Sequence, residues 1–215
     1  MSTRTHLSRT SSVRVEDLLT LLEWKRRVFA LYQDVRAMDP QAGWQRWRDV
    51  RDELFRDHPQ SPLPKEARGA FTGLEYFPYD VVWRVVAEVV PVERELVKIG
   101  ASAGEAIPFE RFAQVRFVLA DEALTLDLFW LDAYGGGVFL PFSDGTSGSE
   151  TYPAGRYLLD TVKGADLGGA DGQLILDFNY AYNPSCSYDP RWTCPLAPPA
   201  NRLHHGIRAG ERTPE

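Results

Sequence analysis

The sequence has no long apolar run, only two cysteines and only four histidines among its 215 residues. No segment approaches the ~20 apolar residues that a membrane-spanning helix requires, so no membrane partner is expected. Two cysteines are too few for a disulfide scaffold, and a chain of this length can bury a hydrophobic core without cross-links. The start, residues 1–14, lacks the apolar core of a secretory signal. We expect it to be disordered and the protein to be cytoplasmic.

Signatures of catalysis and of cofactor binding are also missing. The chain has no Gly-x-Ser-x-Gly nucleophile elbow, no P-loop, no dinucleotide fingerprint and no HExxH metal motif. The net charge of −6 argues against a nucleic-acid partner, because the phosphate backbone requires a basic surface. No cofactor is therefore evident, no nucleic-acid partner is expected, and the sequence leaves open both enzymatic activity and oligomeric state.

Two amphipathic helices are predicted near the start of the chain. In residues 15–36, and again in residues 40–57, apolar side chains recur at three-and-four spacing on one face. Asp39 supplies an N-cap for the second helix and Pro40 its first residue, whereas the prolines after His58 end it. The predicted inner faces are Leu21, Trp24, Val28, Leu31 and Val35 in the first helix and Trp44, Trp47, Val50 and Leu54 in the second.

Short apolar or alternating segments separated by turn residues dominate residues 70–178. Short strands at close spacing, with no helix between them, are typical of an antiparallel sheet curled into a barrel or roll. We predict an α+β fold of one domain, residues 15–215, in which the helical part, residues 15–57, packs on an antiparallel β-barrel or roll. An ordered, irregular coil rich in Pro, Tyr and Cys follows over residues 179–211. The predicted strands are 80–90, 95–99, 111–119, 123–131 (with Leu124, Leu126, Leu128 and Trp130 on one face), 138–142, 155–160 and 173–178.

The strongest candidate site is the glycine-rich stretch FSDGTSGSETYPAGRY, residues 142–157. Small residues let backbone amides turn toward a ligand, and Arg156 can bind a carboxylate or phosphate through two hydrogen bonds. The alternative is a long connection whose hydroxyls bond their own backbone while Arg156 pairs with Asp144 or Glu150. A hydrolase that uses Asp144 and Glu150 for proton transfer is our second functional hypothesis. The candidate binding residues of the loop are Asp144, Thr146, Ser147, Glu150, Tyr152 and Arg156.

The C-terminal coil, residues 179–211, carries a repeated turn motif. Asn or Asp before Pro favours a turn, and such pairs occur at Asn183 and Asp189. We predict that the coil lies across the open edge of the barrel as a fixed lid. Our first functional hypothesis is that the coil and the 142–157 loop bind a small molecule. The candidate binding residues of the coil are Asn179, Asn183, Asn201 and Arg202.

Cys186 and Cys194 have three candidate roles. Two buried, reduced thiols that pack as small hydrophobes are favoured, because cytoplasmic thiols usually stay reduced. A disulfide that closes a small loop is the second alternative. A zinc site completed by His204 and His205 is the weaker third, since the spacing is not CxxC. Nothing in the pattern indicates a catalytic thiol.

The helix tryptophans and His58 are the remaining candidates. Trp24, Trp44 and Trp47 could anchor a partner protein, although their spacing favours packing on the sheet. A protein-interaction module is therefore the third hypothesis. His58 ends the second helix beside a rigid turn, and a helix-end histidine satisfied by its neighbours is favoured over a catalytic base.

Three motifs of the chain resemble one family. They are WRDVRDELFRDHPQSPL, FSDGTSGSETYPAGRY and LDFNYAYNPSCSYDPRWTCPLAPPANRLHHGIRAGE, and they lie within residues 45–211. The chain thereby resembles the bacterial and archaeal family filed as domain of unknown function 1684. The resemblance implies a single-domain protein and no established activity. One departure is Pro153, which stands after the Thr-Tyr pair where that family has a small residue, often Gly.

Overall fold

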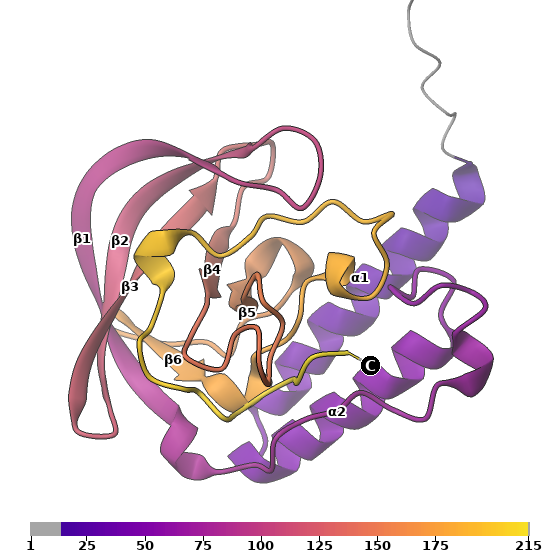
Figure 1. Cartoon of the computed structure of the whole chain (residues 1–215), viewed down its shortest axis with the longest axis horizontal. Coiled ribbons are helices and arrows are strands. Elements are labelled where there is room, and N and C mark those ends of the chain that lie inside the picture. Colours follow the sequence, from indigo (N-terminus) through magenta and orange to yellow (C-terminus); the bar gives the residue numbers. More distant parts are fainter. Residues whose placement is uncertain (1–13, 215) are drawn as a thin grey trace, which may run out of the picture.

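Two helices form one layer of the molecule. α1 (Val15–Arg36) and α2 (Pro40–Asp57) lie side by side in this computed structural model (Figure 1). The structure describes residues 14–214, and the terminus predicted to be disordered, residues 1–14, falls almost wholly outside that part. No helix within the described residues is long and apolar enough to cross a bilayer. Both helices have the bounds that the apolar periodicity predicts.

The limits of α2 follow from the residues at its two ends. The Asp39 carboxylate accepts the backbone N–H groups of Gln41 and Ala42 at 3.1 and 3.2 Å, which satisfies two donors that the helix itself leaves unpaired. Pro40 at the first position has no N–H to satisfy. His58 is the C-cap, so the predicted start and end of α2 are both confirmed.

The buried face of α1 covers only its C-terminal half. Leu31, Tyr32 and Val35 are buried, whereas Leu21 is 41% exposed. The prediction that Leu21 faces inward is wrong, because the N-terminal half of α1 extends past the sheet (Figure 1). The predicted inner residues of α2 are all buried: Trp44, Trp47, Val50 and Leu54.

Six strands form one antiparallel sheet in the order β5-β4-β3-β2-β1-β6. The long strands β1 and β2 carry register shifts at Pro91–Glu95 and Arg111–Ala113, and the sheet curls into a half-barrel (Figure 1). The predicted α+β fold with an antiparallel sheet is confirmed. The strands are β1 (Arg84–Ile99), β2 (Ile107–Leu119), β3 (Glu122–Leu131), β4 (Val138–Phe142), β5 (Arg156–Asp160) and β6 (Gln173–Asp177).

The first strand differs from the prediction at both of its ends. Residues Val81–Trp83 form a short 3-10 turn instead of strand, because the Asp80 carboxylate accepts the N–H of Val82 at 3.0 Å. The segment 95–99 is not a separate strand but the end of β1, which continues through the bulge after Pro91.

The C-terminal coil is part of the hydrophobic core. Leu203, Ile207 and Ala209 pack against the apolar side chains of the sheet and are almost completely buried. A second cluster joins the helices to the coil through contacts among residues such as Trp47 and Tyr180. The coil therefore contributes side chains that the curled sheet needs to fill its inner face.

The coil also pairs with the edge of the sheet. Tyr182 exchanges both backbone hydrogen bonds with Tyr157 of the edge strand β5, at 2.9 and 3.1 Å. Further bridges join Pro195 to Ala101 and Arg202 to Ser143. In Figure 1 the coil and the chain end cross the open side of the half-barrel. The coil therefore lies where it was predicted and covers an edge that would otherwise expose unpaired backbone groups.

Candidate functional site

The 142–157 loop is organised around the buried carboxylate of Asp144. Its Oδ1 accepts the backbone N–H and the hydroxyl of Thr146, at 2.7 and 2.6 Å, and the N–H of Ile207 at 3.1 Å. Its Oδ2 accepts Nη2 of Arg156 at 2.9 Å. Because four donors already occupy this carboxylate, it has little capacity left to accept a proton from a substrate.

Arg156 joins the loop to the end of the chain. Besides Asp144, its guanidinium donates to the backbone carbonyls of Ile207 at 3.0 Å, Glu211 at 3.1 Å and Ala209, while its Nε is buried without a hydrogen-bond partner. Burial lowers the pKa of Arg156 from its ordinary value, and the adjacent Asp144 carboxylate opposes that shift. Arg156 thus fixes the main chain that carries Glu211.

The other polar side chains of the loop bond within the protein too. Glu150 pairs with Arg208 at 2.8 Å near the surface, so the structure does not pair Glu150 with Asp144. The hydroxyl of Ser147 accepts the N–H of Asp144, and that of Ser149 donates to a carbonyl of the loop. Ligand binding by this loop stays a prediction, and so does a hydrolase that uses Asp144 and Glu150.

Two predicted binding residues of the coil attach it to the rest of the fold. Asn201 exchanges side-chain hydrogen bonds with the backbone N–H and carbonyl of Asp127, at 2.8 and 2.9 Å. Asn179 does the same with the backbone of Asp80, at 3.1 and 2.8 Å. Both amides are buried, whereas Arg202 is exposed. These asparagines hold separate segments together, and neither lines one of the cavities described below.

The buried carboxylate of Glu211 gathers four polar residues from three segments: α2, the segment before β1 and the coil. It forms an ion pair with Arg51 of α2 and accepts the N–H of Asn183 at 2.6 Å, the hydroxyl of Tyr188 at 2.7 Å and that of Tyr76 at 3.3 Å. Its side chain is 1% exposed. A charge so deeply buried is tolerated because it has a counter-ion and several hydrogen-bond donors.

The two phenols of this cluster act as donors at neutral pH. Burial raises the pKa of both Tyr76 and Tyr188 well above the ordinary tyrosine value, and the negative charge of Glu211 raises them further. A backbone bridge between Tyr76 and Glu211 fixes the register of the segment that precedes β1 against the chain end. Both hydroxyls therefore stay protonated and directed at the carboxylate.

Arg51 reaches Glu211 from within a group of aromatic rings. Its guanidinium carbon lies 4.8 Å from the ring centre of Trp47, 5.2 Å from that of Phe55 and 5.1 Å from that of Tyr182. Ring faces attract a cation, so they partly replace the water that Arg51 loses on burial. The ion pair is thus held between α2, the coil and the chain end.

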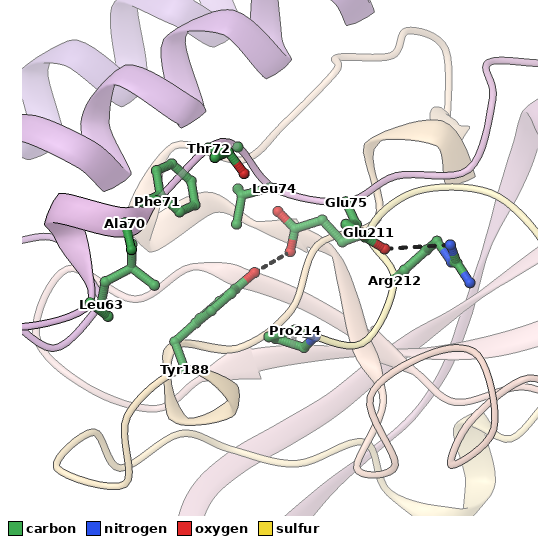
Figure 2. A pocket seen from close by; sticks show the side chains of 12 residues that line it. Leu63, Ala70, Phe71, Thr72, Leu74, Glu75, Tyr188, Glu211, Arg212 and Pro214 are labelled. Atoms are coloured by element: carbon green, nitrogen blue, oxygen red, sulfur yellow. Dashed lines mark hydrogen bonds and ion pairs between the residues drawn. The ribbon is translucent and has the colours of Figure 1, made fainter.

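A cavity of about 320 Å³ lies against the Glu211 cluster, between residues 63–75 and the end of the chain (Figure 2). The Tyr188 hydroxyl and the Glu211 carboxylate form one polar part of its wall, and the ion pair of Glu75 with Arg212, at 3.4 Å, forms another. A cavity of this size suits a small molecule, at the lower end of the usual range for ligand sites. Its apolar wall residues are Leu63, Ala67, Ala70, Phe71, Leu74 and Pro214.

A smaller cavity of about 70 Å³ lies beside Arg51, and Asn183 lines it. The Asn183 amide donates through Nδ2 to the carbonyl of Arg212 at 2.7 Å, which orients its Oδ1. That Oδ1 is buried and has no hydrogen-bond partner among the described residues. Of the predicted binding residues in the coil, Asn183 is the one whose side chain offers an unused acceptor next to a cavity.

The two cysteines are neighbours, and both are free thiols. The N–H of Cys186 lies 3.4 Å from Cys194 Sγ; Cys194 is 4% exposed, whereas Cys186 is only partly buried. The interpretation as two buried thiols is therefore wrong for Cys186. His204 is exposed and His205 pairs with Glu122 at 2.5 Å. Within the described part of the chain, no three His, Cys, Asp or Glu side chains form a group that could hold a metal ion, so these cysteines and histidines do not gather into one.

His58 and the helix tryptophans have partners inside the protein. His58 Nε2 contacts the carboxylate of Glu23, and its ring lies 5.1 Å from that of Trp24 in an edge-on arrangement. Trp44 and Trp47 are 5% and 0% exposed, so they are not available as anchors for a partner protein. The alternative in which these residues pack within the fold is the one that the structure shows.

Comparison with known proteins places the chain in a family. Residues 69–212 match the model of a family described as protein of unknown function, DUF1684. The chain belongs to this family. The chain is also similar to an uncharacterized protein of Haloarcula marismortui whose solution NMR structure is known. The two sequences are 37% identical, the structures superpose with a TM-score of 0.58, and the match covers 79% of this chain and 91% of that one. No curated protein matches.

The DUF1684 match confirms the resemblance seen in the sequence and contains most of the Glu211 cluster. Tyr76, Asn183, Tyr188 and Glu211 all lie within residues 69–212. Arg51 lies before them, on α2, so in this DUF1684 protein the counter-ion comes from outside the matched residues.

Sequence reasoning missed Arg51, Tyr76 and Glu211. One signal was available, because Arg51 lies four residues after Trp47 and three before Leu54, on the apolar face of α2. A charge on an inner face requires a buried partner of opposite sign. The identity of that partner follows only from the fold, since Glu211 lies 160 residues further along the chain.

Proposed function

We propose that the protein binds a small, mostly apolar molecule in the 320 Å³ cavity beside Glu211, with a hydrogen-bond donor of the ligand directed at Tyr188. The observation that carries the proposal is a mostly apolar cavity that ends at the hydrogen-bonded pair of the partly buried Tyr188 and the buried Glu211. Apolar walls with a few fixed polar groups are the usual composition of a small-molecule site. The coil supplies Tyr188, in keeping with the hypothesis that the coil forms part of a binding site.

The Tyr188 hydroxyl determines which polar group the ligand needs. Its proton is directed to Glu211 at 2.7 Å, so its oxygen is left with lone-pair capacity to accept a further hydrogen bond. A ligand hydroxyl or N–H is the complementary group. A molecule of the same shape without such a donor would leave that oxygen unpaired and bind more weakly.

The charges of the site favour a neutral ligand. Glu211 is neutralised by Arg51, and Glu75 by Arg212, so both carboxylates that line the cavity have a counter-ion. A charged ligand would lose its hydration without gaining an unpaired partner. We therefore infer a neutral molecule with an apolar body and one hydroxyl or amide group.

The proposal is tested with two probes that differ in one group, 2-phenylethanol and ethylbenzene. Ligand-observed NMR should show that 2-phenylethanol binds the full-length protein more tightly than ethylbenzene. Tyr188→Phe should lower the affinity for the alcohol about fivefold to tenfold and should hardly change the affinity for the hydrocarbon. Leu74→Trp, which fills the cavity, should abolish binding of both.

A matched control is Leu96→Trp, which adds the same ring at a position of β1 that is 74% exposed. It should leave the affinity for both probes unchanged. Equal binding of either probe to the wild type and to Leu74→Trp would show that they bind elsewhere, and would contradict the proposal. If 2-phenylethanol does not bind a folded wild type, the proposal is contradicted as well.

A further inference from the structure

The two cysteines lie on segments that are held in place differently. Cys194 is fixed beside the end of β1, where Ser102 donates its backbone N–H to the Cys194 carbonyl at 2.9 Å and its hydroxyl accepts the Cys194 N–H at 3.0 Å. Cys186 lies in a single 3-10 turn, Ser185–Ser187, that no β-ladder holds. A sulfur on a short turn can move toward a fixed partner with little change elsewhere in the fold.

The two cysteines are adjacent, and solvent reaches one of them. The Cys186 N–H points at Cys194 Sγ, at 3.4 Å. Cys194 is buried and Cys186 is partly exposed. The hydroxyl of Tyr152 lies 3.9 Å from Cys186 Sγ on another side. A reagent from solution therefore meets Cys186 first and finds Cys194 directly behind it.

We propose that Cys186 and Cys194 form a dithiol site that hydroperoxides oxidise reversibly to a disulfide. The Cys186 thiolate attacks one peroxide oxygen, so that an S–O bond forms, the O–O bond breaks and hydroxide or alkoxide leaves. Cys194 then attacks the sulfur of the resulting sulfenic acid; the S–S bond forms, the S–O bond breaks and water carries away the Cys194 proton. Two thiols are oxidised, one peroxide is reduced, and an external dithiol reverses the change.

The surroundings of the two sulfurs favour this division of roles. The hydrogen bond from the Cys194 thiol, with smaller contributions from Ser102 and Tyr152, outweighs burial and lowers the pKa of Cys186 to about 6. The same hydrogen bond, together with burial, raises the pKa of Cys194. Cys186 is therefore largely thiolate at neutral pH and can attack a peroxide, whereas Cys194 keeps its proton until the second step.

Neither sulfur lines the cavity beside Glu211, so oxidation of the two thiols is tested separately from ligand binding there. The test uses the reduced full-length protein, treated with a small excess of hydrogen peroxide and analysed by denaturing mass spectrometry. We expect a loss of about 2 Da, the mass of two hydrogens, and recovery of the original mass with dithiothreitol. Retention of two alkylatable thiols after the peroxide treatment would overturn the proposal.

Two variants assign the roles of the sulfurs. In Cys194→Ser, dimedone should trap a sulfenic acid at residue 186; in Cys186→Ser, residue 194 should react at least tenfold more slowly than Cys186 does in the wild type. Equal reactivity of the two variants would overturn the assigned roles. If a variant fails to fold, peptide mapping of the wild type after brief alkylation gives the same information, since Cys186 should be labelled first. Preferential labelling of Cys194 would refute the proposal.

Discussion

Replacing the Glu211 carboxylate by an amide tests whether the cluster around it holds the fold together. Glu211→Gln keeps the shape of the side chain but removes the counter-ion of Arg51, whose side chain is 14% exposed. The amide also places two donors where Tyr76, Tyr188 and the N–H of Asn183 already donate. The variant thus combines an unpaired buried cation with a conflict between donors.

The expected magnitude follows from the burial of this pair. Removing one partner of a buried ion pair costs about 3–5 kcal/mol, and this figure already includes much of the penalty for hydrogen bonds left unmade. We therefore expect Glu211→Gln to lower the free energy of unfolding by about 3–5 kcal/mol. For a chain of this length, that corresponds to a fall in melting temperature of roughly 6–20 °C.

Urea unfolding followed by circular dichroism measures the effect, with Glu150→Gln as the matched control. Glu150 pairs with the exposed Arg208, so its loss should shift the midpoint far less. The double variant Arg51→Met/Glu211→Gln should be less destabilised than the sum of the two single variants, because methionine suits the surrounding aromatic rings and removes the orphaned charge. Additive effects, or equal midpoints for Glu211→Gln and Glu150→Gln, would refute the reasoning.

Three further predictions concern the core, the coil and the thiols. Trp47→Ala should lower the free energy of unfolding by about 3–5 kcal/mol in urea titrations, because this ring is 0% exposed and its removal leaves a cavity. Asn201→Leu should cost about 3 kcal/mol in the same assay, since it leaves the N–H and carbonyl of Asp127 and the carbonyl of Pro141 without this partner. The rate of Cys186 alkylation by iodoacetamide should rise with pH and reach half of its plateau near pH 6, because its lowered pKa of about 6 leaves the thiolate populated above that pH; a midpoint near that of an ordinary thiol would contradict this.

The sequence predicted the elements whose causes are local. The Asp39-Pro40 cap and the prolines after His58 set the two ends of α2 through neighbouring residues alone. The alternation of apolar residues likewise predicts where most of the strands lie. Prediction failed where a distant segment decides the outcome. Leu21 obeys the helical period but lies where α1 has passed beyond the sheet. The start of β1 is the exception, since the missed cause is local: the Asp80 carboxylate caps residues 81–83, which alternation assigns to a strand.

The candidate site illustrates the same limit. Its central ion pair joins residues 160 positions apart, and its phenols come from two further segments. Nothing near Glu211 in sequence indicates burial, because a glutamate close to a chain end is ordinarily solvated. The hydroxyls and charges of the 142–157 loop were conspicuous in the sequence, yet Asp144 and Arg156 are bonded to one another and to the backbone of the chain end.

Arg156 therefore acts on the cavity indirectly, through the main chain that carries Glu211. Two variants can separate this indirect effect from direct contact of a side chain with the ligand. Arg156→Met leaves Asp144 buried without its counter-ion and releases the carbonyls of Ile207 and Glu211, so it should cost about 3–5 kcal/mol of stability. It should also weaken 2-phenylethanol binding, because Glu211 loses its fixed position. Tyr188→Phe should instead weaken binding with a much smaller loss of stability. The contrary result is an Arg156→Met protein that is destabilised as expected but, at a temperature where it is folded, binds 2-phenylethanol with wild-type affinity. In that case the position of Glu211 does not depend on Arg156, and Arg51 and the two phenols alone hold the cavity wall.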